Sequence, residues 1–209
     1  MTATRNSQFL RTISLLVTIC LFSLSAKAQY GGGSGEPNYP YLIYTAEQMN
    51  AVGANQDDWD KHFILMPDVD LSTYTGTDFN IIGYYVDWDD NKPFTGVFDG
   101  EGKTISNFSY TSTDKDYIGL LGHVSGVAEI KDLGLIAPNI DGGTGNYVGA
   151  LIGLSAGTIT GCYVESGSAS GDRCVGGLVG YNRGGTINNC YSSVNVYGDA
   201  EVGGLVGEN

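Results

Sequence analysis

The sequence predicts an all-β protein, a right-handed parallel β-helix in which short coils of nearly constant length, about 27 residues, stack on one another. Three observations predict this fold. Glycine is unusually frequent, short apolar segments recur at a nearly constant spacing, and the second half of the chain lacks apolar residues at helical spacing. The 209 residues include 32 glycines and 14 tyrosines. Glycine at this frequency without a collagen triplet indicates many tight turns between short strands.

The chain begins with the features of an export signal. Two arginines precede an apolar stretch over residues 13–24, and Ala26-Lys27-Ala28 then matches a signal-peptidase cleavage site. We therefore expect residues 1–28 to be a signal peptide. The apolar stretch is too short for a membrane span, and no second one follows. We expect a secreted protein, extracellular or on the cell surface, in an oxidising environment.

The charge of the mature chain limits its partners. The predicted signal peptide holds three of the ten basic residues and no acidic one, so the remainder has a net charge of −16. A surface this acidic repels nucleic acid and anionic membranes. It is also what an ordinary solvated surface of an exported protein looks like. We expect no nucleic-acid partner, and no membrane span once the signal is cleaved.

The segment after the signal predicts a lead-in followed by a cap. Residues 29–40 are rich in glycine and proline and are expected to be flexible. Residues 41–103 are expected to hold an N-terminal cap and the first coils. Within them, Thr45 and Gln48 have the spacing of a capping box, which predicts a short helix to about Val52. An open β-helix end exposes unpaired strand edges, and this helix is expected to cover them.

Two patterns repeat over residues 104–209, and each keeps nearly the same step along the chain. A Gly-Leu-X-Gly segment has its second position at Leu120, Leu151, Leu178 and Leu205. A Thr-Ile-X-Asn segment has its second position at Ile105, Ile130, Ile159 and Ile187. The fourth position of the second pattern is Asn, Asp or Gly, and these types best tolerate a left-handed backbone, so we expect a corner there. Units this short bury an apolar face only by stacking.

These repeats resemble a known family. Residues 174–182 and 201–209 look like the GLUG motif, 147–153 and 117–122 look like weaker copies, and 94–105 is similar to the segment that often precedes such repeats. The resemblance covers roughly residues 41–209. GLUG repeats occur in large bacterial surface and secreted proteins, including adhesin-like proteins and IgA-specific metallopeptidases. The resemblance implies an extracellular repeat module and, by itself, no activity.

The last residue falls inside a repeat. Asn209 follows shortly after a Gly-Leu-Val-Gly segment. A coil that ended there would expose an unpaired strand edge. We therefore expect the sequence to be part of a longer chain, truncated at residue 209, with further repeats or another domain following.

The sequence offers little support for catalysis. His62 and His123 lie outside any His-Glu-X-X-His pattern, so the resemblance to metallopeptidases does not extend to their zinc site. Polysaccharide lyases and hydrolases built on β-helices need a placed acid and base, and no such pair occupies matching coil positions. We expect a non-catalytic, adhesin-like binding scaffold or spacer, with an extracellular glycan or protein as ligand. A carbohydrate-active β-helix enzyme is the alternative.

One acidic segment is a candidate metal site. Asp87, Asp89 and Asp90 are dense enough to bind a structural calcium ion, the one cofactor that the sequence suggests. The segment lacks the glycine and distal glutamate of an EF-hand loop. A solvated loop is the competing interpretation.

Aromatic residues flank this segment. Tyr84, Tyr85 and Trp88 are a candidate platform for a sugar ring, since aromatic faces pack against apolar faces of sugars. The alternative is a loop with partly packed aromatics.

Two cysteines occupy the same position in successive repeats. Coil stacking would bring the Cα atoms of Cys162 and Cys190 within disulfide range. Phe108 and Leu133 precede them in that column, so an inward stack of reduced thiols is the alternative. Cys174 has no partner in this pattern.

Overall fold

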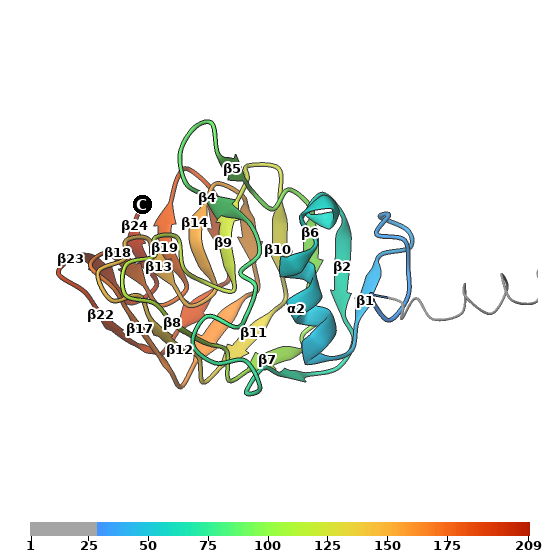
Figure 1. The fold of residues 1–209 in the computed structure, drawn as a ribbon, viewed down its shortest axis with the longest axis horizontal. Helices are drawn as coiled ribbons and strands as arrows, with labels where there is room; N and C mark the ends of the chain where they lie inside the picture. Colours follow the sequence, from blue (N-terminus) through green and yellow to red (C-terminus); the bar gives the residue numbers. More distant parts are fainter. Residues whose placement is uncertain (1–28) are drawn as a thin grey trace, which may run out of the picture.

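The structure, a computed structural model, describes residues 29–209, so the predicted signal peptide at 1–28 lies outside the described residues. The chain winds into a parallel β-solenoid of about four turns with about 29 residues per turn, which confirms the predicted fold class. Figure 1 shows the short strands stacked along the long axis, with the single α-helix of the described chain at the N-terminal end.

Five parallel sheets run along the stack, and each complete coil contributes one strand to each. The first sheet contains β1 (Tyr41–Ile43), β2 (His62–Leu65), β6 (Val97–Asp99), β10 (Glu129–Lys131), β15 (Thr158–Thr160) and β20 (Thr186–Asn188). The second contains β3 (Val69–Asp70), β7 (Thr104–Ser106), β11 (Gly134–Ile136), β16 (Tyr163–Glu165) and β21 (Tyr191–Ser192).

The other three sheets complete the coil. The third contains β8 (Ser109–Thr111), β12 (Asn139–Asp141), β17 (Ser168–Ser170) and β22 (Asn195–Tyr197). The fourth contains β13 (Val148–Gly149), β18 (Arg173–Gly176) and β23 (Ala200–Gly203). The fifth contains β9 (Leu121–Val124), β14 (Ile152–Ser155), β19 (Val179–Asn182) and β24 (Val206–Glu208).

The Gly-Leu-X-Gly repeats stack as predicted. In the fifth sheet Leu121 pairs with Ile152, Ile152 with Val179, and Val179 with Val206. Each of these residues directly follows a leucine of the repeat, so the paired positions keep the same steps as the leucines. The repeat period is therefore the length of one coil, and it varies because the turns between strands differ in length.

The second repeat is confirmed in three copies and wrong in one. Ile130, Ile159 and Ile187 form one column of the first sheet, but their predecessor there is Phe98. Ile105 belongs to the second sheet, where it pairs with Leu135. In the first copy the pattern forms the second-sheet strand of its coil, and not the first-sheet strand. Ile105 therefore lies later in its coil than the other three isoleucines do, and the step from Ile105 to Ile130 is the shortest of the three.

The corners of this repeat have the expected backbone. Asp132, Gly161 and Asn189 follow the first-sheet strands with φ of 49°, 65° and 52°. Asn107 also has a positive φ, 59°, but it follows a second-sheet strand, where Ala137 takes the same conformation. Asn, Asp and Gly adopt this left-handed conformation at least cost, so the residue type at each corner helps to fix where the chain turns.

The interior of the stack is one continuous apolar core. Side chains at the strand centres alternate inward and pack coil on coil. Aromatic residues fill the N-terminal part, where the Phe63 and Phe98 rings stack 6.3 Å apart, and aliphatic residues such as Ile130 and Ile159 fill the middle. Because each coil covers the apolar face of the next, stability depends on the contacts between coils.

The predicted helix is present as α2 (Ala46–Ala54), followed by a 3₁₀ turn, η1 (Gln56–Asp58). The Thr45 side chain accepts a hydrogen bond from Gln48 N (3.3 Å), and Gln48 Oε1 accepts one from Tyr44 N (2.7 Å). The helix buries Met49 and Val52 against the core. It therefore covers the apolar end of the stack. None of the helices within residues 29–209 is long and apolar enough to cross a membrane.

The lead-in, expected to be flexible, is instead bonded to the first coil. Gly31 N donates to Leu42 O (2.8 Å) and Leu42 N donates to Gly32 O (3.0 Å), so this segment, and not α2, pairs with the outer edge of β1. The Tyr30 ring is buried and packs 5.5 Å from the Phe63 ring. The glycines predicted a flexible segment, but here they let the backbone of the lead-in come close enough to β1 to form hydrogen bonds. The packing of Tyr30 against Phe63 adds a further contact.

Candidate functional site

An insertion in the first coil shapes the candidate site. Ile82 forms a bridge to Leu121 and Phe94 forms one to Val124, so residues 82–94 span the positions that the short strand β9 spans alone. The extra residues form an antiparallel hairpin of β4 (Tyr84–Tyr85) and β5 (Asn91–Lys92). Figure 1 shows this hairpin standing out from the side of the stack. The insertion is therefore the main departure from the repeat.

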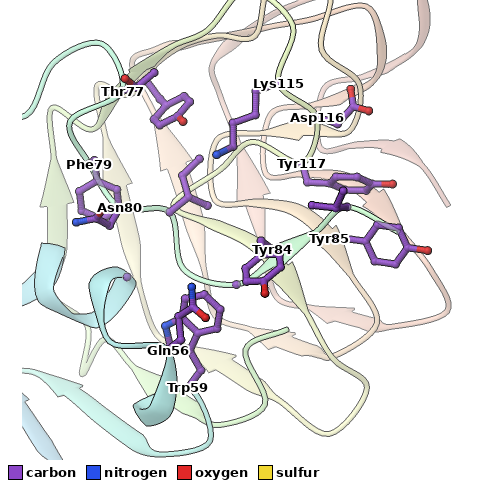
Figure 2. Close-up of a pocket in the computed structure, with 15 residues that line it drawn as sticks. Gln56, Trp59, Thr77, Phe79, Asn80, Tyr84, Tyr85, Lys115, Asp116 and Tyr117 are labelled. Carbon is purple, nitrogen blue, oxygen red and sulfur yellow. The ribbon is translucent and has the colours of Figure 1, made fainter. Parts of the chain in front are cut away.

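A cavity of about 570 Å³ lies between this hairpin, the end of α2 and the loop that precedes β9. Its lining is rich in aromatic rings, with a few polar groups among them. The aromatic and polar residues of the lining include Gln56, Trp59, Asn80, Tyr84, Tyr85, Tyr110, Lys115, Asp116 and Tyr117. Figure 2 shows Lys115 and Tyr84 reaching into it from opposite sides.

Trp59 forms a fixed part of the wall. It is 2% exposed, and its indole Nε1 donates to Val52 O at 2.7 Å. The Tyr84 ring meets it edge to face, with the ring centroids 6.1 Å apart. Burial raises the pKa of Tyr84, and the nearby Asp90 carboxylate raises it further. The Tyr84 hydroxyl therefore stays protonated at neutral pH.

The two charged side chains of the lining, Asp116 and Lys115, differ in whether they already have a polar partner within the described residues. Asp116 Oδ1 accepts hydrogen bonds from the backbone N (2.7 Å) and Nδ2 (3.0 Å) of Asn146. Lys115 Nζ lies 5.7 Å from the centroid of the Tyr110 ring, and no ion pair within residues 29–209 engages it. The lining thus offers an ammonium group to a ligand, whereas its carboxylate is already hydrogen-bonded.

A ladder of tyrosines runs from the pocket along the stack. The ring of Tyr85 lies 5.2 Å from that of Tyr117, which stacks on Tyr147 at 4.8 Å and 7°. Tyr181 continues the ladder 5.8 Å from Tyr147. Desolvation raises the pKa of Tyr117 to about 12, and the neighbouring Tyr147 adds to the effect. Since stacked rings cover each other's faces, the ladder presents mainly ring edges and hydroxyl groups to solvent.

The structure does not assemble the predicted sugar platform as one surface. Tyr84 faces Trp59, while Tyr85 joins the tyrosine ladder. Trp88 contacts Tyr85 edge to face at 6.5 Å but is 76% exposed and lies outside the pocket lining. The guanidinium of Arg183 lies 5.3 Å from the Trp88 ring. Two of the three predicted residues, Tyr84 and Tyr85, thus line the pocket, and sugar binding by these residues stays a prediction.

Several pocket residues carry no sequence signal. Trp59, Tyr110 and Lys115 come from different parts of the first two turns and match no motif, while Tyr117 begins one of the weaker GLUG copies. Only the insertion between Ile82 and Phe94, a break in the repeat, could have pointed to this region.

The predicted calcium ligands do not converge. Asp87 Oδ1 accepts hydrogen bonds from the backbone N of Asp89 and of Asp90, both at 2.8 Å, and so closes the hairpin turn. All three side chains are exposed. Calcium binding needs several oxygen ligands around one point, and these carboxylates do not form such a set in the structure. Calcium binding here stays a prediction.

A different group comes together elsewhere in the described residues, at Cys174, Glu201 and Glu208. The Cys174 Sγ lies 3.0 Å from Glu208 Oε2, and Arg173 donates two hydrogen bonds to Glu201 (2.7 and 2.6 Å). Burial raises the pKa of the Cys174 thiol to about 12, and the Glu208 carboxylate adds to the rise. The thiol is therefore held in its protonated form.

Within residues 29–209 the two histidines lie apart, and the pocket lining holds one carboxylate. His62 lies in β2 and His123 in β9, on different sheets. Burial lowers the pKa of His123, whose Nδ1 lies 3.4 Å from Tyr84 O. Asp116 is the sole carboxylate in the pocket lining, so the pair of carboxylates that glycoside hydrolysis uses is not met there.

Comparisons with known proteins agree on the repeat. The GLUG motif matches residues 171–197. The chain is 32% identical over 145 residues to Halomucin from Haloquadratum walsbyi, across 67% of this chain and 2% of that protein. It is 37% identical over 142 residues to a provisionally named Gly-rich membrane protein from Evansella cellulosilytica, across 66% of this chain and 16% of that protein. The chain thus spans a small part of these curated relatives.

A solved structure shares the fold. The crystal structure of a candidate immunoglobulin A1 protease from Bacteroides ovatus superposes with a TM-score of 0.56 and 19% identity, covering 86% of this chain and 65% of that one. At this identity the likeness concerns the fold alone.

Proposed function

We propose that this chain, a GLUG-motif repeat protein, is a non-catalytic module of a secreted or cell-surface protein that binds a carbohydrate in the pocket beside Tyr84 and Lys115. The observation that carries the proposal is the aromatic pocket created by the hairpin insertion. Sugar sites combine aromatic rings, which pack on C–H faces, with a few placed polar groups. The relatives' names, Halomucin and a membrane protein, support a place at the cell surface.

The pocket also favours a class of sugar. Lys115 brings a positive charge into an otherwise acidic protein, and no ion pair in the described residues neutralises it. An ammonium group forms its strongest hydrogen bonds with an anionic partner. We therefore expect a sugar that carries a carboxylate or sulfate to bind more tightly than its neutral analogue.

The solenoid supplies the second part of the proposed role. Strands that pair from coil to coil make a stiff rod that can hold the pocket away from the attachment point. The relatives are far longer than this chain, which supports its use as one unit of a long protein. Adhesion through the pocket and spacing by the rod are compatible roles. A measurement of ligand binding distinguishes an adhesin-like scaffold, which binds a ligand, from a pure spacer, which does not.

A glycan array followed by titration calorimetry tests the proposal. We expect the full chain to retain acidic glycans, and Tyr84→Ala to weaken binding roughly fivefold, because an aromatic contact contributes about 1 kcal/mol. Lys115→Met should remove the preference for acidic over neutral sugars and leave neutral binding in place. Tyr197→Ala, which changes a 60% exposed tyrosine in β22, is the matched control and should bind like the parent.

Three outcomes would contradict this function. The folded chain retains no glycan, or Tyr84→Ala binds as tightly as the parent, or incubation with acidic polysaccharide releases new reducing ends or unsaturated products. The last result would favour the carbohydrate-active enzyme.

A further inference from the structure

The solenoid register places two cysteines side by side. Cys162 and Cys190 immediately precede Tyr163 and Tyr191, which are paired residues of β16 and β21. Each cysteine follows a corner with positive φ, 65° at Gly161 and 52° at Asn189, so both side chains leave equivalent backbone positions. Neighbouring strands place paired Cα atoms about 4.8 Å apart. That spacing lies within the range that a disulfide spans.

The two thiols already interact. The proximity of the two thiols lowers the pKa of Cys190 and raises the pKa of Cys162. Cys190 Sγ also lies 3.2 Å from Asn188 O and 3.7 Å from Ile159 O. Cys162 is fully buried, whereas Cys190 is partly exposed. Of the pair, Cys190 is therefore both the better nucleophile and the one that a reagent in solution reaches.

The third cysteine of the described chain is separate. Cys174 lies in β18 of the fourth sheet, whereas Cys162 and Cys190 adjoin the second. Its Sγ is engaged with Glu208 at 3.0 Å. The geometry therefore selects one pairing out of the three that these cysteines allow.

We propose that Cys162 and Cys190 form a disulfide that ties two neighbouring coils together in the oxidised protein. The bond spans one coil and joins two neighbouring coils, of which the one that holds Cys190 is the more exposed. Each coil of a stacked array is held mainly by its contacts with its neighbours. A cross-link at this position restrains the separation of the two coils.

The reaction needs an oxidant, and a low-molecular-weight disulfide such as glutathione disulfide supplies it. The Cys190 thiolate attacks one sulfur of the oxidant, forming a mixed disulfide and releasing one thiol. The Cys162 thiol then loses its proton and attacks Cys190 Sγ, which expels the second thiol. In total the two cysteines lose two protons and two electrons, and the oxidant is reduced to two thiols.

A peptide map under non-reducing conditions tests the bond, since cleavage after Lys131, Arg173 and Arg183 puts the three cysteines into separate peptides. The full chain is incubated with glutathione disulfide, alkylated and digested with trypsin. We expect peptide 132–173 linked to peptide 184–209, two hydrogens lighter than the separate reduced peptides. The peptide 174–183 should be alkylated. Reduction should split the linked pair.

Unfolding in urea provides the second measurement. The oxidised parent should have a higher midpoint than the reduced parent, while Cys190→Ser should show the same midpoint under both conditions. Cys174→Ser should keep the difference. The proposal is overturned when the folded, oxidant-treated chain has both Cys162 and Cys190 alkylated, or when Cys174 is found in the link. Neither outcome depends on whether the pocket binds a sugar.

Discussion

Gly177→Ala is expected to lower the free energy of unfolding by about 3 kcal/mol, because a methyl group there overlaps the next coil. A Cβ on Gly177 would collide with the backbone carbonyl of Gly204 and with the Ser192 hydroxyl. The carbonyl belongs to a neighbouring coil and cannot turn away as a flexible side chain would. Urea unfolding, followed by circular dichroism, measures the loss as a shift in midpoint.

Gly204→Ala is the matched control, since Gly204 is the equivalent glycine one repeat later. A Cβ at that position would meet nothing within 4 Å. We expect a change in unfolding free energy of no more than about 0.5 kcal/mol, or a slight gain from the restricted unfolded chain. Equal losses for the two variants would show that contact between coils is not why the motif contains glycine.

The same reasoning explains the other glycines of the motif. A Cβ on Gly176 would overlap the carbonyl of Val179 within the same repeat, and one on Gly180 would lie 2.6 Å from the backbone of Tyr147 and Val148 in the preceding coil. The first glycine thus permits a tight local turn, and the other two permit close approach to the coils on either side. The GLUG pattern follows from these contacts.

Phe98→Ala is expected to cost about 4 kcal/mol of unfolding free energy, the largest effect among the predicted substitutions. Phe98 is fully buried in β6, between Phe63 of β2 and Ile130 of β10. Its ring stacks on that of Phe63 at 6.3 Å and 22°. Removal of the ring loses its transfer free energy and leaves a cavity that strands paired on both edges cannot close. Thermal and urea unfolding both measure the loss.

Phe98→Leu is the graded control. It keeps an apolar side chain in the column, and we expect a cost of about 1 kcal/mol. A similar loss for alanine and leucine would point to ring stacking as the main contribution, whereas no loss for either would mean that the first coils do not unfold with the rest.

The sequence by itself determined the elements that repeat. The Gly-Leu-X-Gly spacing predicted which residues pair in the fifth sheet, and the residue types at Asp132, Gly161 and Asn189 predicted left-handed corners. The capping box at Thr45 predicted where α2 begins. These features were readable because backbone preferences are local and because stacking requires the same residue types at one position in every coil.

Only the tertiary structure decided where the unique segments lie. The prediction assigned the Thr-Ile pattern at residues 104–108 to the wrong sheet. The pattern predicts a strand and a corner, but it does not specify which sheet of the coil that strand joins. The pocket joins Trp59, Tyr84 and Lys115, and the edge of β1 is paired by the glycines at 31–32. These groups meet through space across stretches of chain without a repeat, so their contacts depend on the lengths and packing of the turns, which no local pattern of residues records.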